Sequence, residues 1–374
     1  MSLISQFYNH PQKVTTTAFS SSGSYSPPVD AWHWFVIAGG GGGGACVVNA
    51  TSTGWWRVAC GGNGGSVRFG WVFLKAAETY TITIGSGGSS IVPTTTTAQS
   101  GNAGSESKMT GGDLVADIVA KGGKGGTYLS TQYNTNDYST TPVTYENAAN
   151  DAGSGLGSEG LGGKGGKVTL SNDIASGDYG CIASGGGAAN AYVISPANIR
   201  GGDIDKVSFG PVYASSGGGG TGGTGGDIAD ADSNVGSSGG GTAGDGQEGD
   251  DAAGGLGSSN TGLVTPGGAG GKSINDPFTQ AESDLIQGGD GSGGGAAFPD
   301  GPGDFDNSYG TSGSGGTFGG GAGGAHKFEN DNAGNGGAYG GGGGGIASAD
   351  ESGPESGAGG SGLVYLEGYF SPSS

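Results

Sequence analysis

Glycine runs that are interrupted at every third position are the feature that most constrains this chain. They include GLGGKGG from Gly160 and GGGGTGGTGG from Gly217. A period of three residues matches an extended left-handed helix that rises about 3.1 Å per residue and makes no internal hydrogen bonds. Because buried backbone groups are nearly always paired, the amides and carbonyls of such a helix need partners elsewhere. The runs therefore predict a bundle of polyglycine II helices whose backbones bond to one another.

The composition favours a folded chain over a disordered or collagen-like one. Glycine supplies 95 of the 374 residues but proline only 13, which is too little for collagen. The chain also has 5 Trp, 14 Tyr and 12 Phe, whereas disordered chains are poor in aromatic residues. Ordering glycine has a large backbone entropy cost, so a single run could not order alone. We expect the runs to order together on a preformed β domain, with a flexible linker as the alternative.

The strand patterns lie mainly in the first part of the chain. β-branched and aromatic residues in alternation predict strands at 15–20, 31–38, 67–74, 79–84 and, at the end of the chain, 362–370. Shorter strand-like inserts follow at 167–170 and 207–214, with a weaker one at 262–265. No stretch sustains a helical period between start and stop signals. The expected fold is therefore mostly β, with almost no α-helix.

The glycine content divides the chain near residue 150. Residues 1–150 hold 24 glycines, whereas residues 151–362 hold 70, and all five tryptophans lie in the first part. That part should contain the conventional hydrophobic core. We expect a small β-sandwich-like framework that is closed by the C-terminal strand and carries the polyglycine II bundle. The predicted segments are an N-terminal attachment segment (1–14), the framework (15–130), a loop rich in Tyr, Thr and Asn (131–150), the bundle with loop inserts (151–362) and the closing strand (363–370).

Charge, apolar stretches and cysteine count indicate which partners and which surroundings the chain is suited to. The formal net charge is −20, so the chain should repel nucleic acid and bare anionic membranes. The longest apolar stretch, 32–38, is too short to span a bilayer, and a secretory leader is not evident. Cys46, Cys60 and Cys181 have no metal-ligand spacing, and an odd count favours reduced thiols. Pairing of Cys46 with Cys60 stays open.

Two segments have the composition of recognition loops. Residues 128–145 mix Tyr133, Tyr138 and Tyr145 with Ser, Thr and Asn, as antibody loops do, because tyrosine offers a large contact area at a small entropic cost. The alternative is that these tyrosines pack on the bundle or on a neighbouring subunit. Residues 298–309 combine aromatic side chains with Asp304, Asp306 and Tyr309 and form a second candidate of the same kind.

A pair of tryptophans lies between the first two cysteines. If Trp55 and Trp56 were exposed, they would anchor a partner, since binding hot spots favour tryptophan. Core packing is the alternative interpretation. His33 lies within the clearest strand pattern, which indicates a structural role.

Glycine-containing motifs carry little information in this background. GLGGKG from Gly160 matches a dinucleotide pattern by chance, and PGGAGGKS from Pro266 lacks the first glycine of a phosphate-binding loop. The acidic stretch from Asp230 to Asn234 has a calcium-like spacing, but Val235 stands where such loops need glycine. The three histidines are far apart, and neither a nucleophile nor a carboxylate pair can be placed. We expect no enzyme activity, no cofactor and no dedicated metal site.

The order of motifs resembles the glycine-rich domain of bacteriophage tail fibres. FSSSGSYSP from Phe19 and AGGGGGG from Ala38 match its opening, GGNGG from Gly61 and AKGGKGG from Ala120 follow in its order, and GSGLVYLE from Gly360 is similar to its terminal strand. The sequence departs from that family at 75–78, where a proline-glycine turn is usual, and in its long acidic middle region.

The resemblance implies a virion component that acts outside the cell, at the host surface. It would be a tail fibre or fibre-tip adhesin whose loops bind a receptor, either a saccharide or an outer-membrane protein. Other fibre subunits would be its partners, and a homotrimer or another homo-oligomer is expected. Whether the chain is a tip, a shaft or a decoration stays open. The alternative class is a secreted or cell-surface glycine-rich structural protein, such as a filament, a matrix component or an ice-binding bundle.

Overall fold

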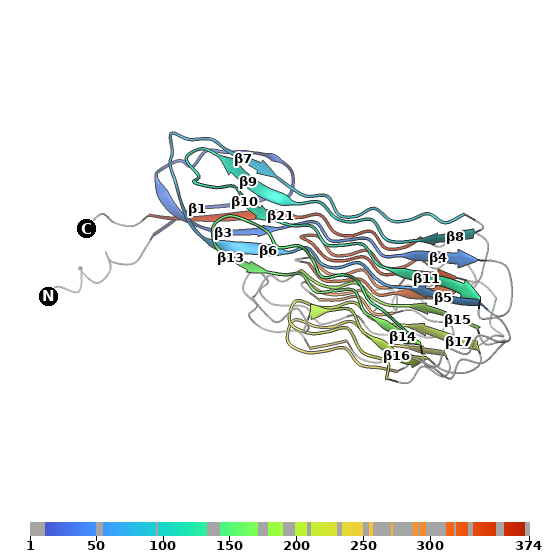
Figure 1. Ribbon diagram of the computed structural model, residues 1–374. Coiled ribbons are helices and arrows are strands. Elements are labelled where there is room, and N and C mark those ends of the chain that lie inside the picture. Colours follow the sequence, from blue (N-terminus) through green and yellow to red (C-terminus); the bar gives the residue numbers. More distant parts are fainter. Residues whose placement is uncertain are drawn as a thin grey trace.

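The computed structural model describes residues 12–49, 55–94, 96–132, 143–170, 179–189, 199–207, 211–229, 234–249, 254–256, 271, 287–290, 292–296, 312–317, 319–327, 332–348 and 355–370. Figure 1 shows strands at both ends of an elongated molecule, joined by extended glycine runs. We call the end that holds strands 12–19 and 363–370 the terminal end and the opposite end the distal end. The described residues contain strands and no α-helix, which confirms the predicted mostly-β class.

Two sheets at the terminal end form the framework. The first has the order β1 (Gln12–Phe19), β21 (Leu363–Phe370), β3 (Ala31–Ala38), β6 (Val67–Leu74), β13 (Ser158–Gly160). The second has the order β10 (Ile118–Ala120), β9 (Ser107–Gly111), β7 (Tyr80–Thr83), β2 (Gly23–Tyr25). The C-terminal strand β21 pairs with both β1 and β3, so it closes the first sheet as predicted.

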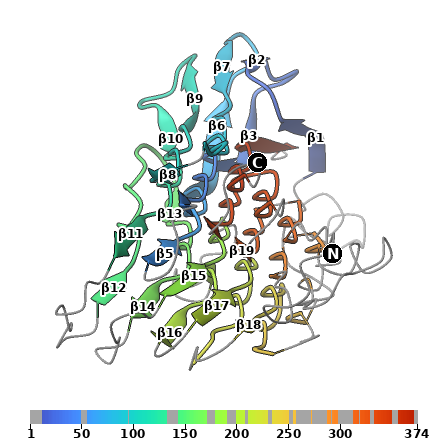
Figure 2. The same ribbon diagram turned by 90° about the vertical axis from the view of Figure 1, so that its right-hand side faces the viewer.

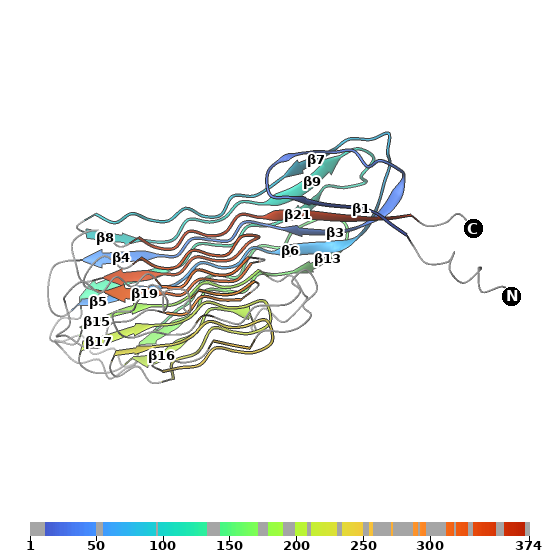
Figure 3. The ribbon, with the colours of Figure 1, turned by 180° about the vertical axis from the view of Figure 1, so that it is seen from behind.

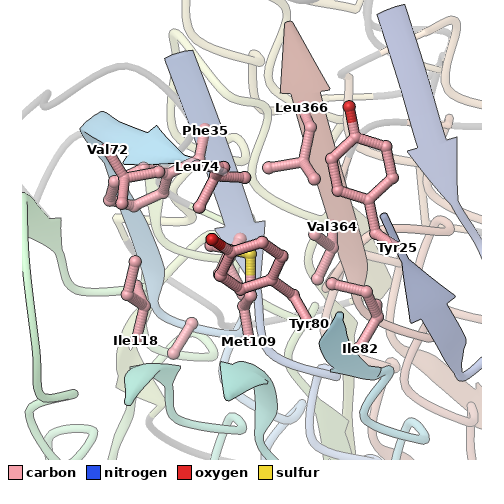
Figure 4. Packing of buried hydrophobic residues seen from close by; sticks show 12 residues of the cluster. Tyr25, Phe35, Val72, Leu74, Tyr80, Ile82, Met109, Ile118, Val364 and Leu366 are labelled. Carbon is pink, nitrogen blue, oxygen red and sulfur yellow. The ribbon is translucent and has the colours of Figure 1, made fainter. Parts of the chain in front are cut away.

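The framework core lies between these two sheets. Phe35, Leu74 and Leu366 come from the first sheet, and Tyr80, Ile82 and Met109 come from the second; all six are almost fully buried (Figure 4). Their alternation with outward-facing residues follows from the two-residue period of a strand. The framework therefore has the sandwich arrangement that the strand patterns predict. Its core excludes the tryptophans Trp32, Trp34 and Trp71, which lie on the other face of the first sheet.

Three sheets form the distal end. The largest has the order β11 (Tyr128–Gln132), β5 (Trp55–Ala59), β15 (Tyr179–Ala183), β17 (Pro211–Ser215), β18 (Asn234–Gly236). The second has the order β12 (Val143–Tyr145), β14 (Val168–Leu170), β16 (Ile204–Val207), and the third β19 (Ala325–Lys327), β20 (Ile346–Ser348), β4 (Cys46–Asn49), β8 (Thr96–Gln99). The insert predicted at 207–214 divides between β16 and β17, and the one at 262–265 lies outside the described residues.

Run 39–44 shows how the glycine helices are bonded. Its successive N–H groups donate to three neighbouring runs, 61–66, 101–105 and 357–360, and the order repeats after three residues. The bonds are Gly39 to Ser66 O, Gly40 to Ser105 O, Gly41 to Gly360 O, Gly42 to Asn63 O, Gly43 to Asn102 O and Gly44 to Gly357 O, all 2.8–3.0 Å. Its carbonyls accept from three further runs, 85–89, 121–126 and 341–345. Run 39–44 therefore has six neighbours, as a polyglycine II helix inside a bundle requires.

The same packing explains why run 39–44 contains only glycine. A methyl group on Gly39 would lie 2.1 Å from Lys121 O, and one on Gly42 would lie 2.0 Å from Lys124 O. Every position of the run faces a neighbouring backbone within 2.8 Å in this way. Runs at the surface need glycine at two positions of three. Lys121 and Lys124 occupy the third position of run 121–126, where a side chain can leave the bundle.

The bundle is wider in sequence than the glycine content indicates. The glycine content predicts a bundle at 151–362. The same hydrogen-bonded array also contains five earlier runs: 39–44, 61–66, 85–89, 101–105 and 121–126. Figure 2, seen from the distal end, shows these blue and green segments beside the orange and red ones. The lower glycine content of the first 150 residues reflects their longer strands. Residue 150 is therefore no boundary of the bundle.

Candidate functional site

The distal end is the candidate site because both predicted recognition loops are anchored there. Residues 133–142 lie outside the described residues, but they follow the distal strand β11 (Figure 1) and precede β12, which pairs with the distal strand β14. Residues 297–311 also lie outside them. The residues that border this second segment are anchored beside distal strands: Ala296 N donates to Ser237 O at 3.1 Å, and Ser312 N donates to Asn332 O at 3.0 Å. Five of the candidate residues fall in these two segments: Tyr133, Tyr138, Asp304, Asp306 and Tyr309.

The region predicted as a loop at 131–150 is shorter than expected. β11 continues to Gln132, the second residue of this region, and β12 spans Val143–Tyr145 within it. β11 pairs antiparallel with β5, and β12 pairs antiparallel with β14. The Tyr145 side chain is partly buried against the distal core, which agrees with the packing alternative for this residue.

The burial of Trp56 contradicts the hypothesis that this tryptophan anchors a partner. Its side chain is fully buried, in a cluster with Val58, Ile182 and Val212 that holds the largest distal sheet against its neighbours. A side chain in this position cannot contact a receptor, so core packing applies. The strand alternation of β5 sends Trp56 into the core because Val58 and Cys60 follow it on the same face. The Trp55 side chain lies outside the described residues.

An asparagine cluster supports the base of the first loop. Asn147 and Asn150, three residues apart, lie beside run 61–66, and their Nδ2 groups donate to Gly61 O and Gly64 O, each at 2.6 Å. Their Oδ1 atoms accept from Thr127 N at 2.8 Å and Lys124 N at 3.2 Å. The two side-chain amides thus bond to the flanking runs as the peptide groups of another glycine helix would.

Asn63 completes this cluster from within run 61–66. It is fully buried, and its Nδ2 donates to Asn150 Oδ1 at 2.9 Å while its Oδ1 accepts from Asn147 Nδ2 at 2.9 Å. These residues are not among the candidate site residues that the sequence predicts. The signal that could have found them is the spacing of three between Asn147 and Asn150, which equals the period of the glycine helix. Asn332 and Asn335 repeat it, and their Oδ1 atoms accept from Glu355 N and Ala358 N.

Three buried serines join neighbouring glycine runs at the points where these runs leave the distal strands. Ser184, Ser216 and Ser237 are buried, and each begins a run that follows a distal strand. Their hydroxyls accept from Gly61 N, Gly185 N and Gly217 N at 3.2 Å and donate to Gly166 O, Gly202 O and Gly226 O at 2.5 Å. Each serine thereby satisfies one donor and one acceptor at the point where strand geometry changes to glycine-helix geometry.

Ion pairs connect neighbouring runs on one wide face of the bundle. The pairs are Lys121 with Glu106, Lys124 with Asp151, Lys164 with Glu146, Lys167 with Asp203, and Arg200 with Asp227, at 2.6–3.5 Å. Asp203 is the most buried of these groups. Burial raises the pKa of the Asp203 carboxyl above its ordinary value, and Arg200 at 3.0 Å opposes this shift. The lysines of this face are therefore engaged within the chain.

The cysteines and the motif residues have structural surroundings. Cys46, Cys60 and Cys181 are buried and form no disulfide with one another, so Cys46 and Cys60 are not paired. Gly163 and Gly165 of the dinucleotide-like motif donate to Ala188 O and Asn63 Oδ1 within the bundle. Among the described residues, no group of three or more His, Cys, Asp or Glu side chains is placed to hold a metal ion. Within the same residues, no helix has the length and apolarity to cross a membrane.

The comparison with protein families agrees with this architecture. Residues 16–259 match the model of the glycine-rich domain family. The chain belongs to this family. The match supports the glycine-rich part of the resemblance and says nothing of tail fibres. It ends at residue 259, although the glycine-rich bundle continues through runs 312–317, 332–337, 341–345 and 357–360. A search of curated proteins found no match.

Proposed function

We propose that this chain is a non-enzymatic structural protein that displays recognition loops, and that it serves as a tail fibre or fibre-tip component of a virion. The observation that carries the proposal is the anchoring of both loop segments at the distal end. Both described chain ends lie at the opposite end, on β1 and β21 (Figure 3). A backbone-bonded bundle between the two ends would hold the loops away from the point of attachment and would limit their movement relative to it.

The composition of the segments between distal strands supports a role in binding. Segments 50–54, 133–142, 171–178, 208–210, 230–233, 297–311, 328–331 and 349–354 together contain twelve Asp and Glu residues and no Lys or Arg. The described residues on both sides of each segment lie at the distal end. Like charges repel, so phosphate-rich surfaces are poor targets for this end. We infer a receptor that is neutral or positively charged, either a saccharide or an outer-membrane protein.

The test is binding of the purified chain to candidate host cells. We expect the wild-type chain to bind, and we expect deletion of residues 133–142 or of residues 298–309 to abolish binding while the melting temperature changes little. Val115→Ser is the matched control, because Val115 is 86% exposed in the turn between β9 and β10 at the terminal end. Binding that survives both deletions, or that Val115→Ser abolishes, would contradict the proposal.

Electron microscopy separates this function from the structural alternative. A display protein should form discrete particles, whereas a filament or matrix protein should form open chains, because an interface that does not close generates polymers. The ice-binding alternative requires a regular array of Thr or Ala on one flat face. At the third positions, where side chains can leave the bundle, runs 121–126 and 162–166 instead have Lys121, Lys124 and Lys164.

A further inference from the structure

The first terminal sheet has an aromatic outer face that the framework core does not use. It is formed by Trp32 and Trp34 of β3, Trp71 and Phe73 of β6, and Tyr369 of β21, and we call these residues the aromatic face. The strand register places Trp32 between Phe73 and Tyr369, and Trp34 beside Trp71. The side chains that alternate with them point into the sandwich.

Three of these rings are exposed, and contacts between rings hold them in position. Trp32 and Trp71 each keep 49% of their surface accessible, and Phe73 keeps 39%. Trp71 contacts Trp34 at 5.5 Å and Tyr369 at 5.4 Å between ring centroids, both edge to face. With typical aromatic surface areas, the three exposed rings present about 300 Å² of apolar surface, which is the size at which a patch on a protein surface is often functional.

The chain itself covers the adjoining half of the same outer face. Val36, Ala38, Val67 and Leu363 are buried there against Ala189, and Tyr339 packs partly against them. Tyr339 has a φ of 73°, a backbone conformation that non-glycine residues rarely adopt. The outer face is therefore a packing surface of which one half is already occupied. The aromatic face continues that packing surface toward the terminal end, where Trp32 and Trp71 are about half exposed.

Charge and position indicate what kind of molecule would cover the rest. Lys13 and Glu367 form an ion pair at the border of the aromatic face, so this border is locally neutral. The whole chain carries −20, so electrostatic repulsion disfavours a second copy as the partner and favours a neutral or basic molecule. Gln12 and Phe370, the described chain ends, belong to strands of the same sheet. A neighbour that holds the chain by this end would meet the aromatic face.

We propose that the aromatic face docks on a different protein subunit, neutral or basic, which presents an apolar ridge and holds the chain by its terminal end. The proposal rests on the proposed function, because that function needs the distal end to stay free. Trp32 and Trp71 are the anchors, since tryptophan dominates binding energy where it enters a desolvated contact.

Site-specific crosslinking in intact producing cells tests this assignment. A photo-reactive phenylalanine analogue replaces Phe73 in one variant and Val115 in the control, which is exposed at the same end. We expect position 73 to form an adduct with a subunit of neutral or basic isoelectric point, and we expect no such adduct from position 115. That subunit is then purified, and its affinity for the chain is measured. We expect Trp71→Ser to weaken binding at least tenfold and Val115→Ser to leave it unchanged.

Three results would overturn the proposal. They are an adduct with a second copy of this chain, the absence of an adduct at position 73, and an affinity that Trp71→Ser does not change. Phe73→Ser replaces Trp71→Ser if the latter lowers the melting temperature. Binding of purified chain to host cells reports on the distal end alone. Loss of docking with intact cell binding would therefore reject this inference, whereas the absence of cell binding with intact docking would reject the proposed function.

Discussion

The Asn63 side chain donates from Nδ2 to the Asn150 Oδ1 atom at 2.9 Å, between a buried glycine run and the segment that follows the first loop. Asn63 also accepts from Gly165 N at 3.1 Å, so its amide joins three parts of the chain. A side chain at this position would leave the bundle if segment 147–150 did not cover it. The amide therefore has a structural role at the base of the candidate site.

Replacing this amide should destabilise the bundle. Asn63→Ala removes the bonds of Asn63 to Asn147 Nδ2, Asn150 Oδ1 and Gly165 N, and each buried polar group that loses its partner costs about 1–3 kcal/mol. We expect a loss of roughly 2–4 kcal/mol in the free energy of unfolding, measured by denaturant titration. Asn102→Ala is the control, because the Asn102 bonds to Ser89 are solvent-exposed. Equal losses in both variants would contradict the role assigned to Asn63.

Gly42 should tolerate no side chain. Gly42→Ala places a methyl group 2.0 Å from Lys124 O, a backbone atom that cannot rotate away. We expect a loss of about 3 kcal/mol or more, as in overpacked cores. The matched control is Gly23→Ala in β2, where no atom lies within 4 Å of the new methyl group. That variant should be neutral or slightly stabilised, because alanine restricts the unfolded chain. Similar melting temperatures for the two variants would contradict the packing of run 39–44 against six neighbouring runs.

His33 should make stability depend on pH. Its Nδ1–H donates to Ala31 O at 3.1 Å, and its Nε2 accepts from the Tyr25 hydroxyl at 3.0 Å, so the buried ring is neutral. Burial lowers the pKa of His33 below its ordinary value, against the opposing effect of the bond to Ala31. The unfolded chain then takes up the proton first as the pH falls. The contribution of His33 to stability is complete above about pH 6.5 and is lost below it.

The measurement is the free energy of unfolding at pH 7.5 and pH 5.5 for the wild type and for His33→Gln. Other groups titrate in both proteins, so the difference between them isolates His33. We expect the wild type to lose more stability on acidification than the variant does. An equal or smaller loss in the wild type would show that His33 does not bind its proton more weakly in the folded chain.

The cysteines should be unreactive in the folded protein. Burial raises the pKa of Cys46 to about 12 and that of Cys60 to about 11, and only the thiolate reacts readily with disulfide reagents. We expect negligible reaction with Ellman's reagent at pH 8 and three thiols per chain after unfolding in guanidinium. One thiol per unfolded chain would instead indicate a disulfide. Rapid reaction in the native state would show that the distal core opens readily.

The first 259 residues should not fold without the remainder. β21 lies between β1 and β3 in the first terminal sheet. Runs 341–345 and 357–360 also hydrogen-bond to Gly41, Gly42 and Gly44 of run 39–44. A chain cut after residue 259 would leave these groups unpaired. We expect no cooperative thermal transition for this fragment, and recovery of one when residues 312–374 are added as a separate chain. A cooperative transition in the fragment alone would contradict this dependence.

The local conformations could be predicted from the order of residues alone. The alternation in AWHWFVIA from Ala31 defines a strand, and that strand is present at the predicted residues. The period of three in AKGGKGG defines an extended glycine helix with outward lysines, because only glycine allows backbones to approach so closely. Both signals depend on neighbours in the chain, so they can be read without knowing the fold. The family match and the mostly-β class follow from the same signals.

Which runs meet and which faces are buried depends on contacts between residues that are far apart in the sequence. Trp32 and Trp56 have similar strand surroundings in the sequence, yet one is half exposed and the other fully buried. The difference arises because β3 belongs to a sheet that is covered on one face at that end, whereas β5 lies between packed sheets. Asn63, Asn147 and Asn150 likewise gain a role only when run 61–66 lies beside residues 147–150. A glycine helix offers equivalent hydrogen bonds in six directions, so its sequence cannot specify its neighbours, and the strands at its two ends select them.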